Sequence, residues 1–340
     1  MLFRSKKEGS YYDLPIALGI LCCMGVLNQE SLQSSLIVGE LSLDGSVRDV
    51  RGILPITCAA NDAGFKQCLV PSLNASEGAL VKGIHTIGIS SLEEAIGHLT
   101  GKKPLPHEKY QSPRVDPNLY GTLDFFDVKG QENVKRALEI AAAGNHNLLM
   151  IGPPGSGKTM MAHRLPAILP CLSFEESIEV TKIYSICAQL DDHSHVVTTR
   201  PFRSPHHTTT PAALIGGGRS PKPGEISLAH NGVLFLDEFL EFNKHVLETL
   251  RQPLESRNVT ISRANGSYTF PANFMLIAST NPCPCGFFPD DLKCQCSPQS
   301  IHQYLRKLSG PLLDRIDIHI ETQPIPYEKL TSSVDRKSVV

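Results

Sequence analysis

The sequence has 340 residues, of which 41% are apolar, enough to bury the cores of two or three domains. Its formal net charge of −2 excludes a global positive field for nucleic acid, so any such contact requires a local basic surface. The apolar stretch 14–27 contains Pro15, Gly19 and Gly25, lacks a small-residue cleavage site and is too short to span a bilayer. We therefore expect a cytoplasmic chain with no membrane partner.

Both ends of the chain join abruptly to well-patterned sequence. The peptides 1–5 and 335–340 can be written as translations of sequencing-library adapter DNA. We therefore expect that roughly these terminal residues are artefact and that native sequence is missing on both sides.

The first part of the chain alternates short strands and helices, which predicts a small α/β domain over residues 1–100. The pattern predicts strands at 36–41 and 67–70 and helices near 55–63 and 92–99. Residues 101–123 are rich in Pro, Lys, His, Ser and Asn without an apolar period, and this composition indicates a linker.

A second domain, over residues 124–340, contains the most informative motif. A predicted helix at 130–143 is followed by the apolar strand 147–151 and then by a Gly-Pro-Pro-Gly-Ser-Gly-Lys-Thr run. Strand, phosphate loop and helix in this order predict a parallel-sheet nucleotide fold that binds ATP. The glycines let backbone N–H groups surround the β-phosphate, Lys158 reaches the β/γ-oxygens, and the Thr159 hydroxyl is a Mg²⁺ ligand. The predicted cofactor-binding residues are Gly152, Pro153, Pro154, Gly155, Ser156, Gly157, Lys158 and Thr159, together with Asp237.

An acidic pair follows the apolar run 232–236. Asp237 is expected to hold the Mg²⁺ shell, and Glu238 to orient or deprotonate the attacking water. The strand 274–280 ends at Asn281, where a polar side chain can hold that water opposite the γ-phosphate.

Two segments around the acidic pair are additions to such a core. Residues 214–228 form a glycine-rich insertion, and residues 258–270 alternate around an Asn-Gly turn, which predicts a β-hairpin. Arg263 at the hairpin tip either contacts DNA backbone or is merely solvated. His206 and His207 are interpreted as residues that shape the insertion or touch phosphates, because adjacent histidines rarely chelate one metal together.

Four of the ten cysteines form a C-x-C pair twice, at Cys283, Cys285, Cys294 and Cys296. Four thiolates at a loop can close a tetrahedral zinc site, but unligated reduced thiols are the alternative, because the spacing is less specific than paired C-x-x-C.

With these residues the chain resembles the ComM/YifB family, in the magnesium-chelatase-like branch of AAA+ ATPases, from about residue 6 to 328. The resemblance is carried by the phosphate loop and by four further motifs, which lie at 200–208, 230–239, 279–285 and 312–317. It implies that the insertion and hairpin can line the channel of a ring, that Asn281 is the first sensor, and that Arg315 is a finger for the neighbouring subunit's nucleotide.

The first domain resembles the C-terminal fold of Lon protease, which is related to ribosomal S5. Where the protease has its nucleophilic serine this chain reads Asp13-Leu-Pro-Ile16, and where it has its lysine base this chain reads Arg51-Gly-Ile-Leu54. An alkyl side chain neither attacks a carbonyl nor takes a proton, so we predict no peptidase activity.

The resemblance implies a ring-forming ATPase, a hexameric homo-oligomer, that acts on branched DNA as a branch-migration helicase in recombination or natural transformation. The alternative is a chelatase-type ATPase subunit that remodels a protein partner. The C-terminal lid, which normally adds a second sensor arginine, is expected to be missing from these residues.

Overall fold

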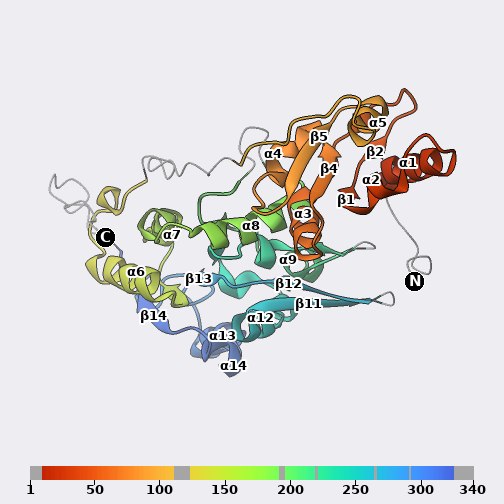
Figure 1. The fold of residues 1–340 in the computed structure, drawn as a ribbon. Helices are drawn as coiled ribbons and strands as arrows, with labels where there is room; N and C mark the ends of the chain where they lie inside the picture. The colour runs from red at the N-terminus through yellow and green to blue at the C-terminus, as the bar shows by residue number, and fades with distance from the viewer. Residues whose placement is uncertain are drawn as a thin grey trace. The chain divides into compact units, whose positions relative to one another are not determined.

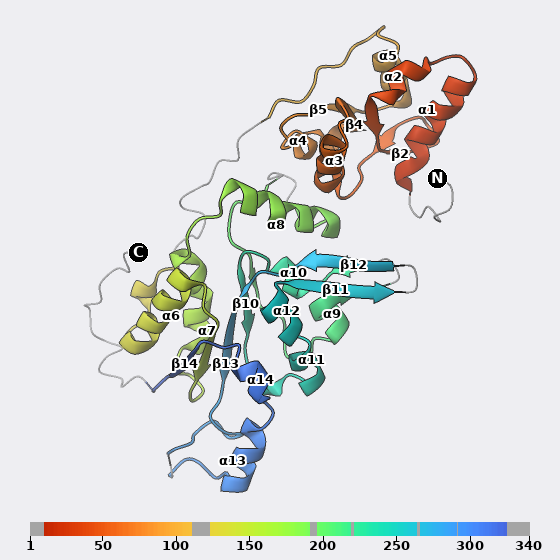
Figure 2. The same cartoon turned by 60° about the horizontal axis from the view of Figure 1, so that its bottom comes forward.

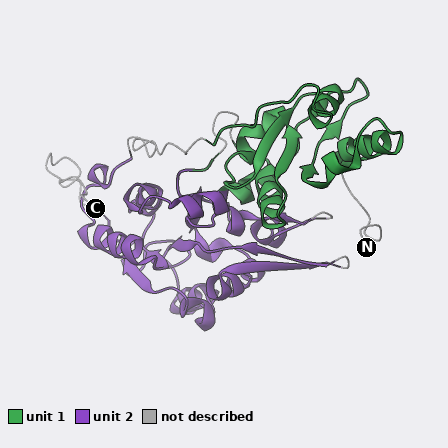
Figure 3. Ribbon diagram, viewed as in Figure 1, with its two compact units in different colours: residues 1–114, 181–197 green, residues 115–180, 198–340 purple. Residues whose placement is uncertain are grey.

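The computed structural model describes residues 10–110, 123–190, 196–218, 221–263, 266–290 and 292–324. The chain divides into two compact units, residues 1–114 with 181–197 and residues 115–180 with 198–340 (Figure 3). Residues 181–197, which lie inside the predicted second domain, therefore cluster with the first unit. Short 3-10 turns are found at Ser10–Tyr12, Ser72–Asn74, Phe125–Asp127, Leu165–Ile168 and Phe239–Glu241.

The first unit is built on a three-stranded parallel sheet in the order β1-β4-β5 (Figure 1). Its strands are β1 (Ser35–Ile37), β4 (Gln67–Pro71) and β5 (His85–Ile89), with β2 (Glu40–Leu41) and β3 (Val47–Arg48) as a separate antiparallel pair. Its helices are α1 (Asp13–Cys23), α2 (Gln29–Gln33), α3 (Ile53–Asp62), α4 (Ala75–Gly78) and α5 (Leu92–Leu99).

Both faces of this sheet are covered, because side chains alternate along each strand. Leu69 of β4 packs in one apolar cluster with Leu14 and Leu18 of α1, whereas its neighbours Cys68 and Val70 pack in a second cluster. A single strand over 36–41 is not formed. Strand β1 ends at Ile37 and β2 begins at Glu40, with Gly39 between them, where a Cβ atom would lie 2.9 Å from Val47 Cγ1.

The second unit contains a five-stranded parallel sheet in the order β14-β6-β13-β10-β7. Its strands are β6 (Leu148–Ile151), β7 (Phe202–Arg203), β10 (Val233–Leu236), β13 (Met275–Thr280) and β14 (Ile318–Glu321). Its helices are α6 (Glu132–Gly144), α7 (Lys158–Arg164), α9 (Pro211–Ile215), α10 (Glu225–Leu228), α11 (Lys244–Glu248), α12 (Arg251–Ser256), α13 (Pro298–Leu305) and α14 (Gly310–Leu313). Helix α8 (Phe174–Cys187) begins in this unit and ends in the segment that clusters with the first.

Helices cover the two faces of the five-stranded sheet, with α6 and α7 on one side and α9 to α12 on the other (Figure 2). Along β10, Val233 and Phe235 pack with the first group, and Leu234 and Leu236 pack with the second. Burial of one such side chain contributes about 1.5–3 kcal/mol. The predicted fold class, α/β with a parallel-sheet phosphate-loop domain, is confirmed.

Two short antiparallel strand pairs of the second unit lie outside the five-stranded sheet. The insertion after α9 is a small antiparallel pair of β8 (Gly216–Gly217) and β9 (Lys222–Pro223), followed by α10. The predicted hairpin is formed by β11 (Asn258–Arg263) and β12 (Gly266–Pro271), which pair from Asn258 with Pro271 to Arg263 with Gly266 and extend as two long arrows in Figure 2. No helix in the described part of the chain is long and apolar enough to cross a membrane.

Candidate nucleotide-binding site

The phosphate loop lies between the end of β6 and the start of α7. Gly155 and Gly157 have φ values of 76° and 86°, a left-handed conformation that side chains disfavour. Gly152 packs against the chain that follows β14, where a Cβ atom would lie 1.9 Å from Thr322 Oγ1. Ser156 Oγ and Thr322 Oγ1 are 2.8 Å apart, so the loop is held in place from its sides as well as from its two ends.

Lys158 is buried and folded back over this loop. Its ammonium donates to the carbonyl oxygens of Gly152 at 2.7 Å and Pro153 at 2.9 Å, and lies 3.4 Å from Asn281 Oδ1. Burial lowers the pKa of Lys158, and the charge of Asp237 partly opposes this shift. A phosphate oxygen is a stronger acceptor than a carbonyl, so this ammonium fits a bound triphosphate.

The acidic pair meets the loop because β10, β13 and β6 are parallel neighbours. Leu236 lies beside Ala278, and Thr280 lies beside Ile151, so the residues after each strand gather at the carboxyl edge of the sheet. Asp237 accepts hydrogen bonds from Thr159 Oγ1 at 2.6 Å and from the Ser279 hydroxyl.

The hydroxyl of Thr159 and the carboxylate of Asp237 fit a Mg²⁺ ion, because this metal prefers hard oxygen ligands and substrate phosphates. Glu238 directly follows, with φ 52°, and its N–H donates to Asp237 Oδ1 at 2.9 Å. This left-handed turn directs the two carboxylates differently, and Glu238 is exposed whereas Asp237 is partly buried.

The structure brings Asn281 to the phosphate loop but keeps Arg315 away from it. Arg315 precedes β14, and its carbonyl oxygen accepts from Asn147 Nδ2 at 2.8 Å, just before β6 begins. The length of β6, on the order of 13 Å, therefore separates Arg315 from the loop at the other end of that strand. The guanidinium forms an ion pair with Glu255 at 3.0 Å.

The four cysteines of the two C-x-C pairs converge. All four sulfur atoms lie within 4.8 Å of one another, and three of the distances are 3.3 Å, 3.6 Å and 3.8 Å. Sulfur atoms bound to one tetrahedral zinc ion lie about 3.8 Å apart, so the set fits this metal. The pKa of Cys285 is lowered to about 6, and the largest cause is the hydrogen bond from the Phe287 N–H. A Cβ on Gly286 would lie 2.7 Å from Pro154 Cδ, so this loop packs against the phosphate loop.

Sequence reasoning missed one contact of the acidic pair. His207 Nδ1 lies 3.1 Å from Glu238 Oε2. The sequence indicates that His207 is polar and near an insertion, but not that β7, four residues before it, pairs with β10. This pairing brings His207 to the carboxyl edge of the sheet, where the acidic pair lies, and His206 beside it is exposed.

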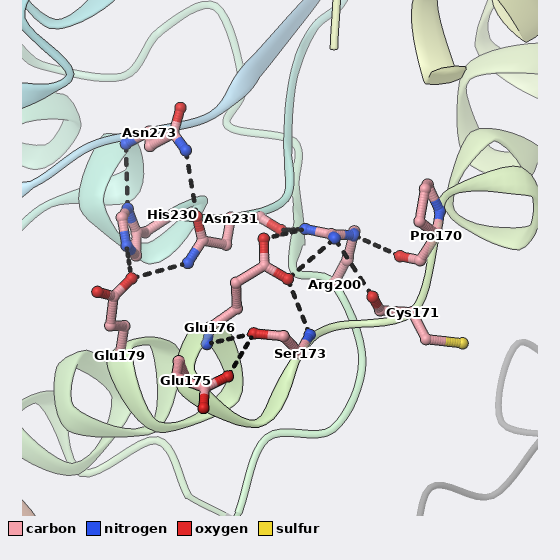
Figure 4. A network of polar contacts seen from close by, with 10 residues as sticks. All are labelled: Pro170, Cys171, Ser173, Glu175, Glu176, Glu179, Arg200, His230, Asn231 and Asn273. Carbon is pink, nitrogen blue, oxygen red and sulfur yellow. Dashed lines mark hydrogen bonds and ion pairs between the residues drawn. The ribbon is translucent and has the colours of Figure 1, made fainter. Parts of the chain in front are cut away.

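A separate polar network lies at the amino edge of the same sheet (Figure 4). Arg200 donates to the carbonyl oxygens of Pro170 and Asn231 at 2.5 Å and 2.8 Å, and it pairs with Glu176 at 3.1 Å. His230 bridges two elements, with Nε2 3.2 Å from Glu179 and Nδ1 accepting from the Asn273 N–H at 3.0 Å. A cavity of about 190 Å³ adjoins these residues. The motifs at 200–208 and 230–239 thus contain structural residues as well as candidate catalytic ones.

Two protein-family models match the sequence of this chain. The family model described as "Magnesium chelatase, subunit ChlI" matches residues 124–330, and the model "Subunit ChlI of Mg-chelatase" matches residues 4–74. The chain belongs to the magnesium chelatase subunit ChlI family. This confirms the family that the motifs predict.

Known relatives in the family differ in how similar they are to this chain. It is 46% identical over 332 residues to the competence protein ComM of Haemophilus influenzae, covering 97% of this chain and 65% of that protein. It is 43% identical over 320 residues to the uncharacterized protein YifB of Escherichia coli, covering 94% and 62%. Identity to the magnesium-chelatase 38 kDa subunit of Rhodobacter capsulatus is 27% over 196 residues, covering 50% and 54%. The chain thus spans less than two thirds of the length of ComM and YifB.

Proposed function

We propose that this protein is an ATP-hydrolysing AAA+ motor. The observation that carries the proposal is the gathering of Lys158, Thr159, Asp237, Glu238 and Asn281 at one edge of a parallel sheet, with Thr159 and Asp237 in direct contact at 2.6 Å. Bound ATP with Mg²⁺ supplies the phosphoanhydride bond and an ion that neutralises its developing charge.

Each residue of the site has a separate role in the proposed hydrolysis. Thr159 and Asp237 hold the ion, and Lys158 exchanges its carbonyl partners for phosphate oxygens. Glu238 takes a proton from the attacking water, and Asn281 orients that water from the end of β13. The exposure of Glu238 supports this role, because the water must reach its carboxylate.

We further propose that hydrolysis needs a ring of identical subunits, a hexamer. The separation of Arg315 from its own phosphate loop supports a role at a neighbouring subunit's nucleotide, where a guanidinium cancels charge on the γ-phosphoryl group. The Arg315 side chain is 39% exposed, and its ion-pair partner Glu255 is exposed too, so breaking this pair in favour of another acceptor costs little.

DNA, and branched DNA in particular, is the proposed substrate, with branch migration in recombination or natural transformation as the activity. The relative from Haemophilus influenzae is named a competence protein, and this name supports the proposal. The exposed hairpin with Arg263 near its tip supports a local contact with phosphates, which the net charge of −2 leaves possible. A nucleotide-hydrolysing protein with free thiols also favours the cytoplasm as the compartment.

The alternative is remodelling of a protein partner, and the likeness to the magnesium-chelatase 38 kDa subunit favours it. The deciding experiment is the ATPase rate of the full-length protein alone and with single-stranded, duplex and four-way-junction DNA. Several-fold stimulation by the junction, lost in Arg315→Ala, supports a DNA motor. An equal rate on every DNA would favour the protein-remodelling alternative, and absence of ATPase activity would overturn both.

We also propose that Cys283, Cys285, Cys294 and Cys296 hold one zinc ion. Protein purified without chelators should contain about one equivalent of zinc, and Cys285→Ser with Cys296→Ser should lose it. Cys171→Ser is the matched control, because this exposed thiol lies outside the cluster. Metal-free protein from a reducing preparation would contradict the proposal.

A further inference from the structure

The loop between β13 and α13, residues 282–297, carries the four clustered cysteines and directly follows Asn281. Its large apolar side chains do not hold it in place, because Phe287, Phe288 and Leu292 are 41%, 44% and 98% exposed. None of its described residues belongs to an apolar core cluster. Fixing a loop costs conformational entropy that buried apolar surface normally offsets, so this loop needs another source of stability.

Among the residues of this loop that the structure describes, only Cys283 and Gly286 are buried. Cys283 lies in the sulfur cluster, with its Sγ 3.3 Å from that of Cys285 and 3.8 Å from that of Cys294. The Phe288 N–H donates to the same sulfur at 3.4 Å, and bonds of this kind orient the ligands of a metal. One zinc ion shared by the cysteines thus supplies the stability that apolar packing does not supply here.

Gly286, the other buried residue, is the contact between this loop and the nucleotide site. It has φ 85°, and its N–H donates to the Cys283 carbonyl oxygen at 3.0 Å. A Cβ atom built on it would lie 2.7 Å from Pro154 Cδ and 3.8 Å from Asn281 Cγ. Asn281 Oδ1 in turn lies 3.4 Å from the Lys158 ammonium. The backbone directly after the first cysteine pair therefore packs against both the phosphate loop and the sensor side chain.

Both ends of the cysteine loop are anchored. It begins after β13, a central strand of the five-stranded sheet, and it ends at α13, whose Tyr304 is buried. Just beyond α13, Lys307 Nζ donates to the Leu240 carbonyl oxygen at 2.8 Å, in the turn that follows the acidic pair. Because the ends are held in this way, the position of Gly286 depends on the middle of the loop, where the cysteines lie.

We propose that zinc bound by the four cysteines controls the nucleotide site. The metal holds Gly286 against Pro154 and Asn281, and its loss weakens ATP binding and lowers kcat for hydrolysis. The proposal rests on the proposed function, because it names how the same ATPase site is regulated. Coupling between two binding sites is reciprocal, so bound ATP must strengthen zinc binding by the same factor by which zinc strengthens ATP binding.

The test measures both directions of this coupling in the full-length protein. The dissociation constant for a labelled ATP should rise on the order of tenfold when a chelator removes the zinc, and added zinc should restore it. Competition with a chromogenic chelator should show zinc binding strengthened by a similar factor when ATP is present. In Lys158→Ala this effect of ATP should disappear, which separates it from binding of zinc by ATP itself.

The contact at Gly286 has its own variant. Gly286→Ala places a methyl group against Pro154, so ATP affinity should fall about as far as in zinc-free protein while one equivalent of zinc is retained. Gly64→Ala is the matched control, because Gly64 has a similar φ of 81° but no atom within 4 Å of its Cβ position. Limited digestion with trypsin reads the loop without activity: cleavage after Lys293 should be faster in zinc-free protein than in zinc-loaded protein.

The possible results separate this inference from the proposed function. Equal ATP affinity and equal kcat with and without zinc, or zinc binding that ATP does not strengthen, would overturn the inference and leave the ATPase in place. A protein that binds no zinc refutes the inference together with the zinc site. Zinc-loaded wild-type protein that binds no ATP refutes the proposed function itself.

Discussion

Thr159 Oγ1 donates a hydrogen bond of 2.6 Å to Asp237 Oδ2, and this bond joins the first turn of α7 to the end of β10. The two residues are 78 positions apart in the chain. Their contact places the two predicted oxygen ligands of one ion side by side, as a shared Mg²⁺ ion requires.

The first prediction concerns this pair. Thr159→Val removes one predicted Mg²⁺ ligand while it preserves the shape of the side chain. The factor by which Mg²⁺ increases the affinity for ATP should therefore be about tenfold or more smaller than in the wild type. Calorimetric titration of ATP with and without Mg²⁺ measures the effect. Thr269→Val, on the exposed face of the hairpin, should leave the affinity unchanged; equal loss in both variants would show that the effect is not local.

The second prediction separates binding from chemistry. Glu238→Gln keeps size and polarity but cannot take a proton, so kcat should fall by about 10²–10⁴-fold while ATP affinity stays within about twofold. Steady-state hydrolysis and equilibrium binding of a labelled nucleotide test this. Hydrolysis at the wild-type rate would remove Glu238 from the mechanism.

The third prediction concerns Asn147, a buried amide before β6. Its side chain accepts from the Leu276 N–H at 2.8 Å and donates to the Arg315 carbonyl at 2.8 Å. Asn147→Leu leaves both groups without these bonds and should lower the free energy of unfolding by about 1–3 kcal/mol, measured in urea. The loop that carries Arg315 should also loosen, so hydrolysis in the assembled protein should fall further than nucleotide binding does.

The fourth prediction is a pH dependence that originates at His230. Burial lowers the pKa of His230 from 6.5, and its hydrogen bond to Glu179, together with the charges of Glu179 and Glu176, partly opposes the shift. The unfolded chain therefore takes up this proton first as the pH falls. Neutral His230 therefore contributes its full share to the free energy of unfolding above pH 6.5, the pKa of the unfolded chain. This contribution is lost as the pH falls below 6.5 and through the lower pKa of the folded protein.

Urea midpoints at about pH 7.5 and about pH 5 measure this effect. In His230→Gln the midpoint should change less between the two conditions than in the wild type. His245→Gln, which removes an exposed histidine, should retain the wild-type difference. If both variants behave alike, the dependence has another origin.

Much of the site could be predicted from the sequence because its motifs are contiguous. The phosphate loop needs glycines where φ is positive and a lysine and threonine directly after them, and all of these lie within eight successive residues, 152–159. The existence of the hairpin follows in the same way from alternation around an Asn-Gly pair, whereas its register, with Arg263 opposite Gly266, was not predicted. The strand expected over 36–41 is two strands in the structure, because β1 pairs with β4 and β2 pairs with β3, and residues 36–41 alone do not indicate these two partners.

By itself, then, the sequence determined the family and the strand–phosphate loop–helix order of 147–164, since these depend on residues that are neighbours in the chain. Only the tertiary structure decided that Ser279 and Thr159 share Asp237, that Asn147 holds the backbone of Arg315, and that His207 meets Glu238. These contacts join segments that strand pairing brings together, and pairing is set by packing of the whole sheet. Local patterns carry no information about which strand becomes the neighbour of which.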